Sequence, residues 1–289
     1  MRIFGPQAPI QYNQGFLVLI GGAEDRRDGK TVLRRTAEIN NAKNVAVIPS
    51  ASGYPTGLAE DYFYAFRDLG VDVVNAIDIR DREDAAKPEF LEKIEQADLI
   101  FFTGGDQVKL VHILNNTPAL DLIRKRHMQG VTIAGTSAGA AAASNPLLCD
   151  GDDRGLIKGS INIHEGFGFL ENVTIDTHFV NRGRIGRLTQ FLCTGQSKKG
   201  IGLGEDTGII VAPDLSFEVI GSELVTVIST DQIHFSNYDR ISENRAIAID
   251  GIQVGFLPPG TIFDIRSWRI KSALAEKKTV AFINNDYRP

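Results

Sequence analysis

Cysteine is scarce in this sequence, which has only two among 289 residues, Cys149 and Cys193. Neither belongs to a Cys-x-x-Cys pair, so a zinc ribbon or redox motif has no support. Histidine and aspartate also lack the spacing typical of metal ligands, and we expect no metal and no cofactor. We expect both cysteines to be reduced, buried thiols, since nothing in the sequence favours a disulfide between them.

Long apolar runs and an excess of basic residues are missing as well. The apolar run at 16–20 ends in two glycines and is far shorter than the roughly 20 residues of a membrane span or a signal peptide's apolar region. We interpret it as a core strand and expect a cytoplasmic protein without a membrane partner. The net charge is −5 and the pI about 5.6. An acidic chain is unlike a nucleic-acid-binding protein, because phosphate binding requires a basic face.

The first half of the chain alternates short apolar segments with amphipathic ones. Strands are predicted at 16–20, 44–49, 71–77, 99–102 and 131–134. Helices are predicted at 30–40, 58–69, 90–96, 109–114 and 118–129. Strands separated by helices imply right-handed crossovers. We therefore expect an α/β fold with a mainly parallel, doubly wound sheet and helices on both faces.

Patterns typical of β-strands dominate after residue 200, while 149–155 is interpreted as a polar loop. We expect extra C-terminal antiparallel strands, extending or flanking the sheet, at 207–212, 217–219, 225–229, 247–249 and 280–284. No internal repeat or linker is visible. We therefore expect a single α/β domain over residues 1–289, with 1–15 as an N-terminal extension.

Three glycine-rich turns follow predicted strands, at 21–22, 104–105 and 135–139. Ligands bind beyond the carboxyl ends of parallel strands, so we expect these turns to meet in one crevice. The third turn is Gly-Thr-Ser-Ala-Gly, and it leads from a strand into a run of small residues at 140–143.

Ser137 lies at the centre of this third turn. A strand, a tight turn and a helix form the context of a nucleophile elbow, in which small neighbours accommodate a strained serine. Ser137 is therefore the candidate nucleophile, and the Ala138 amide would point at the oxyanion. The alternative is a serine that only caps the helix.

Histidines supply the candidates for the base that would activate the serine. His178 follows the apolar run 173–175, so it lies at a strand end, where a catalytic base belongs in this architecture. His164 has similar glycine-rich surroundings and stays open as an alternative. His112 and His127 lie in helical patterns and are interpreted as surface or packing residues.

Six sequence blocks occur in one order along the chain. They lie at 20–25 (Ile-Gly-Gly-Ala-Glu-Asp), 101–107 (Phe-Phe-Thr-Gly-Gly-Asp-Gln), 135–140, 175–179 (Ile-Asp-Thr-His-Phe), 182–188 and 202–207. Together they resemble the cyanophycinase branch of the peptidase family that also contains the aspartyl dipeptidases, from about residue 16 to the C-terminal strands. The resemblance implies a class I glutamine-amidotransferase-like (flavodoxin-like) fold and a serine nucleophile assisted by a histidine and an acid.

The resemblance gives each catalytic residue a role. Ser137 would attack the substrate, His178 would act as general base and then acid, and Glu205 would orient His178. Glu205 can also be interpreted as a carboxylate that caps its turn. Three aspartates between the serine and the histidine are alternative acids: Asp150, Asp152 and Asp153.

The resemblance also implies an oxyanion hole and part of a substrate site. The amide of Gly105 or Asp106 would face that of Ala138, and Gln107 resembles a substrate-binding glutamine. The alternative for Gln107 is a polar residue at a helix N-terminus.

By the same resemblance, Asp176, Thr177 and a basic cluster belong to the substrate site. The cluster consists of Arg182, Arg184 and Arg187. Arginine binds carboxylates bidentately, which suits an Asp-Arg unit; the alternative is a solvated, arginine-rich turn. Thr177 departs from the glutamine usual in close cyanophycinases, which makes another Asp-containing peptide an alternative substrate.

The implied activity is that of a serine exopeptidase that hydrolyses cyanophycin to β-Asp-Arg dipeptides through an acyl-enzyme. Cyanophycin is poly-aspartate with arginine attached to its side chains by isopeptide bonds. The alternatives are a dipeptidase for other Asp-containing or β-aspartyl peptides and a non-catalytic, amidotransferase-like binding module. A cysteine nucleophile is not expected, because a serine occupies the elbow. By analogy with the family, a homodimer is the expected assembly.

Overall fold

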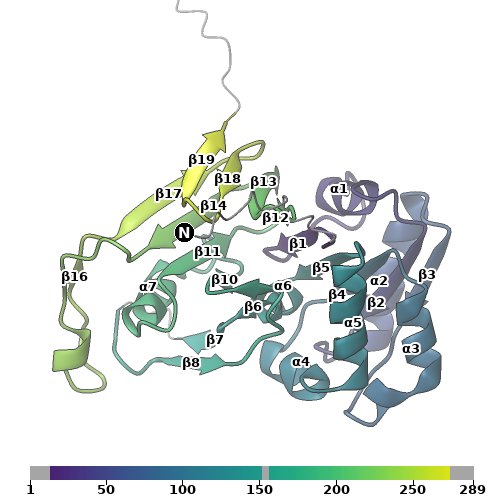
Figure 1. Cartoon of the computed structure of the whole chain (residues 1–289), viewed down its shortest axis with the longest axis horizontal. Helices are drawn as coiled ribbons and strands as arrows, with labels where there is room; N and C mark the ends of the chain where they lie inside the picture. Colours follow the sequence, from purple (N-terminus) through teal and green to yellow (C-terminus); the bar gives the residue numbers. More distant parts are fainter. Residues whose placement is uncertain (1–13, 152–155, 274–289) are drawn as a thin grey trace, which may run out of the picture.

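A nine-stranded sheet forms the centre of the computed structural model, which describes residues 14–151 and 156–273 (Figure 1). Its parallel half consists of neighbouring strands in the order β1 (Leu17–Ile20), β5 (Thr132–Thr136), β4 (Leu99–Phe102), β2 (Asn44–Ile48) and β3 (Val73–Ala76). Its antiparallel half continues from β1 with β12 (Thr207–Val211), β13 (Ser216–Gly221), β18 (Ile262–Asp264) and β19 (Arg269–Ser272).

Helices cover both faces of this sheet. On β1, Val18 and Ile20 pack with the helices of one face, whereas Leu17 and Leu19 pack with those of the other. The first face carries α1 (Thr31–Glu38) and α2 (Pro55–Asp68). The second carries α3 (Pro88–Glu95), α4 (Gln107–Leu114), α5 (Pro118–Met128) and α6 (Ala138–Ala143), with the short 3-10 helix η1 (Asp84–Ala86). The predicted α/β class with a parallel centre is confirmed. Within the described ranges, no helix is long and apolar enough to cross a membrane.

A second, four-stranded sheet packs beside α6 and shares its core. Its strands, in order, are β10 (Thr174–Asp176), β11 (Lys199–Leu203), β14 (Val225–Ser229) and β17 (Gln253–Leu257). One helix, α7 (Ile185–Cys193), packs against it. The sequence pattern did not predict β11, β17 or α7. In β11 two of five residues are glycine, which weakens strand propensity, so its pairing with buried neighbours creates this strand.

Three two-stranded ladders complete the described fold. They are β6 (Ser144–Asn145) with β9 (Leu170–Glu171), β7 (Leu147–Gly151) with β8 (Ile161–His164), and β15 (Phe235–Ser236) with β16 (Ile249–Asp250); the 3-10 helix η2 (Tyr238–Arg240) follows β15. The predicted loop at 149–155 is wrong at its start, because 149–151 belong to β7, in which Asp150 and Gly151 pair with β8. The strand predicted at 247–249 is also wrong. β16 begins at Ile249 and pairs with β15 alone in the described chain, in an exposed arm where no third strand adds support. The strand predicted at 280–284 lies outside the described residues.

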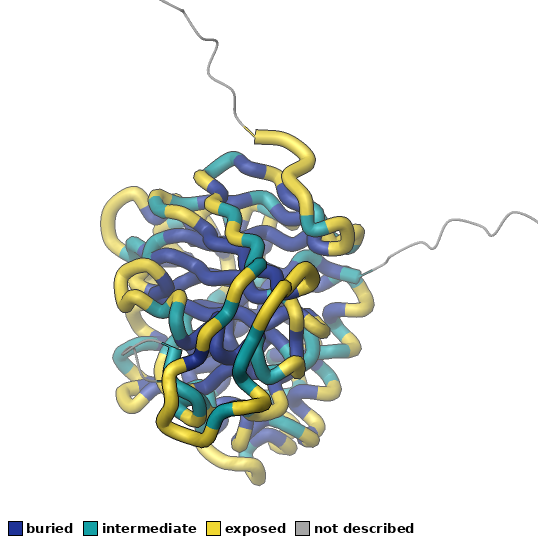
Figure 2. The backbone as a smooth tube through the Cα atoms, turned by 90° about the vertical axis from the view of Figure 1, so that its left-hand side faces the viewer, coloured by how far each residue is buried: buried dark blue, intermediate teal, exposed yellow. Residues whose placement is uncertain are grey.

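The strand register explains where the site forms. Ile20 is paired with Thr136, and Phe102 with Gly135. The glycine turns that follow these strands therefore leave the sheet side by side, as expected. The strands themselves are buried on both faces, and Figure 2 shows this buried backbone surrounded by exposed loops.

Candidate active site

The turn after β5 holds Ser137 in an unusual backbone conformation. Its φ is 50° and its ψ −110°, a combination that few non-glycine residues adopt and that surrounding contacts must enforce. One such contact is the Ser137 amide, which donates to the Ile20 carbonyl at 2.9 Å. The helix that follows, α6, contains only alanine and glycine and is fully buried, so the turn can pack closely behind the serine.

His178 and Glu205 lie in line with the serine. The Ser137 Oγ is 2.9 Å from Nε2 of His178, and Nδ1 of His178 is 2.7 Å from Oε1 of Glu205. In this arrangement the imidazole can take the hydroxyl proton while the carboxylate holds the ring and its tautomer. The three residues follow β5, β10 and β11, so three strand ends supply the triad.

Gly22 shapes the floor beneath the imidazole. Its φ is 100°, and a methyl group added there would lie 2.4 Å from Cε1 and 2.5 Å from Nε2 of His178. The His178 amide donates to the Gly21 carbonyl at 2.8 Å, which brings the histidine onto this glycine pair. Glycine at position 22 is therefore required by the ring itself.

The electrostatics of His178 favour its role as a base. Burial lowers the pKa of His178 below its ordinary value, and the nearby Arg182 charge acts in the same direction, while the hydrogen bond that His178 donates to Glu205 opposes the shift. A histidine with a lowered pKa is neutral at pH 7 and can accept a proton.

Glu205 is held in place by neighbours that the sequence patterns did not reveal. Its backbone amide donates to Oδ1 of Asn181 at 3.2 Å and to Oε2 of Glu223 at 3.1 Å. Asn181 in turn donates to Glu223 at 3.1 Å. Asn181 follows the histidine block by two residues, and that position was the only available signal. Of the alternative acids, Asp150 is exposed on β7, and Asp152 and Asp153 lie outside the described residues.

Comparison with known proteins decides the family. The family model "Peptidase family S51" matches residues 17–218. The chain belongs to peptidase family S51. It is a serine-type peptidase, as predicted. It is 31% identical over 270 residues to the cyanophycinase of Geminocystis herdmanii, a match that covers 92% of this chain and 99% of that protein.

Two further similar proteins extend this result. The cyanophycinase of Synechococcus elongatus is 31% identical over 263 residues, covering 90% of this chain and 82% of that protein. The crystal structure of a peptidase from an acI-B1 Actinobacterium superposes with a TM-score of 0.60 at 26% identity, covering 74% of this chain and 90% of the other. The similarity to a solved peptidase fold therefore extends over most of the molecule.

The wall formed by the turn after β4 carries the amides predicted for the oxyanion hole. A methyl group added at Gly104 would lie 3.3 Å from Cβ of Ser137, so this turn lies against Ser137. The Asp106 amide donates to the Ala51 carbonyl at 2.9 Å, and its carboxylate caps α4. Gly105 thus becomes the preferred partner for Ala138, whose amide begins α6 and has no intrahelical acceptor.

Two of the three predicted substrate-binding arginines are tied to Asp176. The Asp176 carboxylate is 1% exposed and Arg187 is 5% exposed. Arg187 binds it with two nitrogens, at 2.8 Å to Oδ2 and 2.5 Å to Oδ1. Arg184 donates to the Thr177 carbonyl at 2.7 Å and lies 3.4 Å from Asp176. Arg182 is exposed. By its exposure, it is the one arginine of the three that fits the alternative of a solvated turn.

Gln107 and Thr177 also have partners within the protein. The Gln107 side-chain amide donates to the Cys149 carbonyl and so joins α4 to β7. Thr177 is buried, and its amide donates to Asp176 at 2.8 Å.

Burial raises the pKa of the Cys149 thiol to about 12, which keeps it protonated and unsuited to nucleophilic attack. Both cysteines are free, Cys149 buried and Cys193 half-buried.

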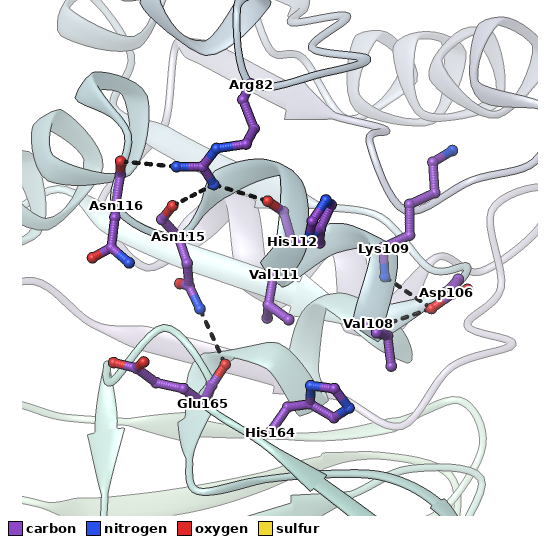
Figure 3. A pocket seen from close by; sticks show the side chains of 10 residues that line it. All are labelled: Arg82, Asp106, Val108, Lys109, Val111, His112, Asn115, Asn116, His164 and Glu165. Carbon is purple, nitrogen blue, oxygen red and sulfur yellow. Dashed lines mark hydrogen bonds between the residues drawn. The ribbon is translucent and has the colours of Figure 1, made fainter.

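A hollow of about 610 Å³ runs along α4, beginning beside the proposed oxyanion wall (Figure 3). It is lined by Arg82, Asp106, Val108, Lys109, Val111, His112, Asn115, Asn116, His164 and Glu165. His164, the alternative base, therefore lies in this hollow, while His178 bonds to Ser137. Among residues 14–151 and 156–273, no group of acidic, histidine or cysteine side chains has the arrangement needed to hold a metal ion.

Proposed function

We propose that this S51 peptidase is an exopeptidase that hydrolyses cyanophycin to β-Asp-Arg dipeptides through an acyl-enzyme at Ser137. The observation that carries the proposal is the line of short contacts from Ser137 through His178 to Glu205. The similarity to proteins named cyanophycinase, over nine-tenths of the chain, supports the choice of substrate.

In the proposed mechanism, His178 removes the proton of Ser137 as its oxygen attacks the scissile carbonyl. The amides of Gly105 and Ala138 stabilise the oxyanion. The intermediate collapses to an acyl-enzyme when the protonated His178 gives its proton to the leaving amine. His178 then deprotonates a water molecule that hydrolyses the ester and regenerates Ser137.

Substrate recognition is proposed for the rim formed by Gln107, Asp176 and Thr177 with Arg182, Arg184 and Arg187. Arg182 is the exposed cation beside the histidine and suits a substrate carboxylate. Asp176 with its arginines would shape the pocket from within. The hollow along α4 presents both Lys109 and Glu165, and this mixed charge suits a polymer that carries carboxylates and guanidinium groups.

The direct test is incubation of the purified protein with cyanophycin, followed by mass analysis for β-Asp-Arg. Release of the dipeptide by the wild type and its loss in Ser137→Ala are expected. Retained release in Ser137→Ala would contradict the mechanism.

The second candidate, a dipeptidase for other Asp-containing peptides, is favoured by Thr177 in place of the family's usual glutamine. It predicts turnover of Asp-X or β-aspartyl dipeptides without turnover of the polymer. A binding module without activity predicts, in addition, no labelling of Ser137 by a fluorophosphonate probe. We also propose a homodimer, which sedimentation analysis would test.

A further inference from the structure

The last residue of β1 and the loop that follows it contact all three segments that carry the triad. These contacts are backbone hydrogen bonds from Ser137 to Ile20 (2.9 Å), from His178 to Gly21 (2.8 Å) and from Asp206, which follows Glu205, to Gly22 (2.9 Å). The segments after β5, β10 and β11, which are distant in sequence, are thus each hydrogen-bonded to one of three consecutive carbonyl groups, those of residues 20–22. The catalytic geometry therefore depends on where this loop sits.

The same loop continues into a buried carboxyl group, that of Glu24. Glu24 is only 5% exposed. Its Oε2 accepts a hydrogen bond from Oγ1 of Thr136 at 2.6 Å, and its Oε1 accepts one from the hydroxyl of Tyr62. Thr136 is the last residue of β5 and immediately precedes Ser137.

A buried carboxyl group is costly unless its hydrogen bonds are satisfied. Glu24 has no role in the triad, yet it lies in the core with one donor on each oxygen. Burial raises the pKa of Tyr62 well above its ordinary value, and the charge of Glu24 adds to this effect. The phenol therefore stays protonated and keeps donating. Arg26 lies over the Tyr62 ring at 5.3 Å and pairs with Asp61 at 3.2 Å, which covers this donor from outside.

The Tyr62 and Thr136 hydroxyls both donate to Glu24, but they connect it to different segments of the protein. Tyr62 connects Glu24 to α2, a helix that carries no residue of the triad. Thr136 connects it to the strained turn, where a serine at φ 50° persists only if its neighbours fix it. The Thr136 bond is thus one of the restraints on the residue next to the nucleophile.

We infer that Glu24 is a positioning residue, which fixes the nucleophile turn through the Thr136 hydroxyl and so sets the distance from Ser137 to His178. This inference rests on the proposed role of Ser137 as nucleophile. Glu24 touches no reacting atom in it. The Ile-Gly-Gly-Ala-Glu sequence at 20–24 then acts as one unit. Its first three carbonyl groups bind the three triad segments, and its carboxyl group holds the serine turn.

The test compares two variants that each remove one donor to Glu24. Thr136→Val is nearly isosteric and removes the donor beside the nucleophile, while Tyr62→Phe removes the remote one. We expect Thr136→Val to slow the second-order labelling of Ser137 by a fluorophosphonate about tenfold or more, since small misplacements of reacting groups have large kinetic effects. Tyr62→Phe should stay within about twofold of the wild type.

Peptidase kinetics give a second readout that a merely structural role would not change. We expect Thr136→Val to lower kcat with KM nearly unchanged, and Thr136→Ser, which keeps the hydroxyl, to restore both kcat and the labelling rate. If Thr136→Val does not fold, the pair Thr136→Ser and Thr136→Ala, which differ by one hydroxyl, replaces it. Equal labelling rates in the variants with and without the hydroxyl, or equal slowing in Tyr62→Phe, would overturn the inference.

The controls separate this inference from the proposed function. If wild-type Ser137 is not labelled, the nucleophile assignment fails. If the wild type is labelled, Ser137→Ala is not, and Thr136→Val reacts like the wild type, the assignment stands and the role of Glu24 fails. Thermal unfolding of each variant identifies effects that come from lost stability alone.

Discussion

Two parts of the candidate site are held in different ways. The catalytic wall carries the triad, and the proposed recognition wall carries Asp176, Thr177 and the three arginines. On the catalytic wall, backbone hydrogen bonds to the consecutive carbonyls of residues 20–22 position Ser137, His178 and the segment of Glu205. On the recognition wall, side chains hold one another, chiefly Asp176 with Arg187. Backbone registration is largely independent of side-chain identity. Apart from Gly22 and the Thr136 hydroxyl, we therefore expect the catalytic wall to tolerate change around the triad, and the recognition wall to be sensitive to each of its members.

The largest effect is expected for Gly22→Ala, the substitution on the catalytic wall that forces the imidazole to move. Gly22→Ala places a methyl group about 2.4 Å from the imidazole, so the ring must move away from Ser137. We expect kcat to fall roughly 100-fold or more, as for a misplaced catalytic group, with KM little changed. Gly29→Ala is the matched control, because its added methyl group would have no neighbour closer than 3.6 Å. A Gly22→Ala enzyme with wild-type kcat would show that the backbone does not fix the ring.

The recognition wall should respond in stability as well as in KM. Asp176→Asn removes the charge that faces the buried Arg187 guanidinium. Breaking a buried pair is expected to cost about 3 kcal/mol of unfolding free energy, measured by urea denaturation, and to raise KM for the polymer. The control Asp214→Asn removes one of two carboxylate partners of Lys271. In this ion pair the side chains of Asp214 and Lys271 are 52% and 44% exposed, and a loss of at most about 1 kcal/mol is expected. Similar losses of unfolding free energy in the two variants would mean that burial of the Asp176–Arg187 pair does not make the recognition wall sensitive to substitution.

The pH dependence of kcat/KM tests both walls together, because Arg182 of the recognition wall lies near His178, the proposed base of the catalytic wall. The proposed base must be neutral, so kcat/KM rises with pH as His178 loses its proton. Since its pKa is lowered, this rise should occur below the ordinary histidine range. Arg182→Gln removes a charge that lowers the pKa and should move the rise to higher pH. Glu205→Gln removes an interaction that raises the pKa and should move it to lower pH. Shifts in the same direction for both variants would contradict this electrostatic description.

The smallest effect is expected in the hollow along α4. His164→Ala should raise KM for the polymer about threefold, the size typical of a weak, exposed polar contact, and should leave the turnover of a short substrate unchanged. His234→Ala is the control, as an exposed histidine whose side chain is 74% accessible and distant in sequence from the hollow. An equal KM for both variants would remove the hollow from the proposed recognition surface.

The sequence predicted the elements that depend on local patterns. The alternation of apolar strands and amphipathic helices predicted β1 to β5 and α1 to α5 with modest shifts of their ends, and the Gly-x-Ser-x-Gly turn located Ser137 because its small residues and its flanking elements are contiguous in the chain. In the second sheet, β10 and β14 were predicted, but β11 and β17 were not. β11 is rich in glycine and becomes a strand only by pairing with β10 and β14. The arm at 247–249 was predicted as a strand of the sheet because its β-type residues carry no information about whether a partner is near.

By itself, the sequence determined the α/β class, the Gly-x-Ser-x-Gly turn and the ordered blocks that mark the S51 family, because these depend on periodicity, turn chemistry and residue identity along the chain. Only the tertiary structure decided which groups meet. It placed Glu205 rather than Asp150 against His178, engaged the Asp106 amide elsewhere, and buried Glu24 beside the turn that holds Ser137. The physical reason is that these contacts join residues separated by long stretches of chain, and a pattern within one segment cannot specify the partner that folding brings to it.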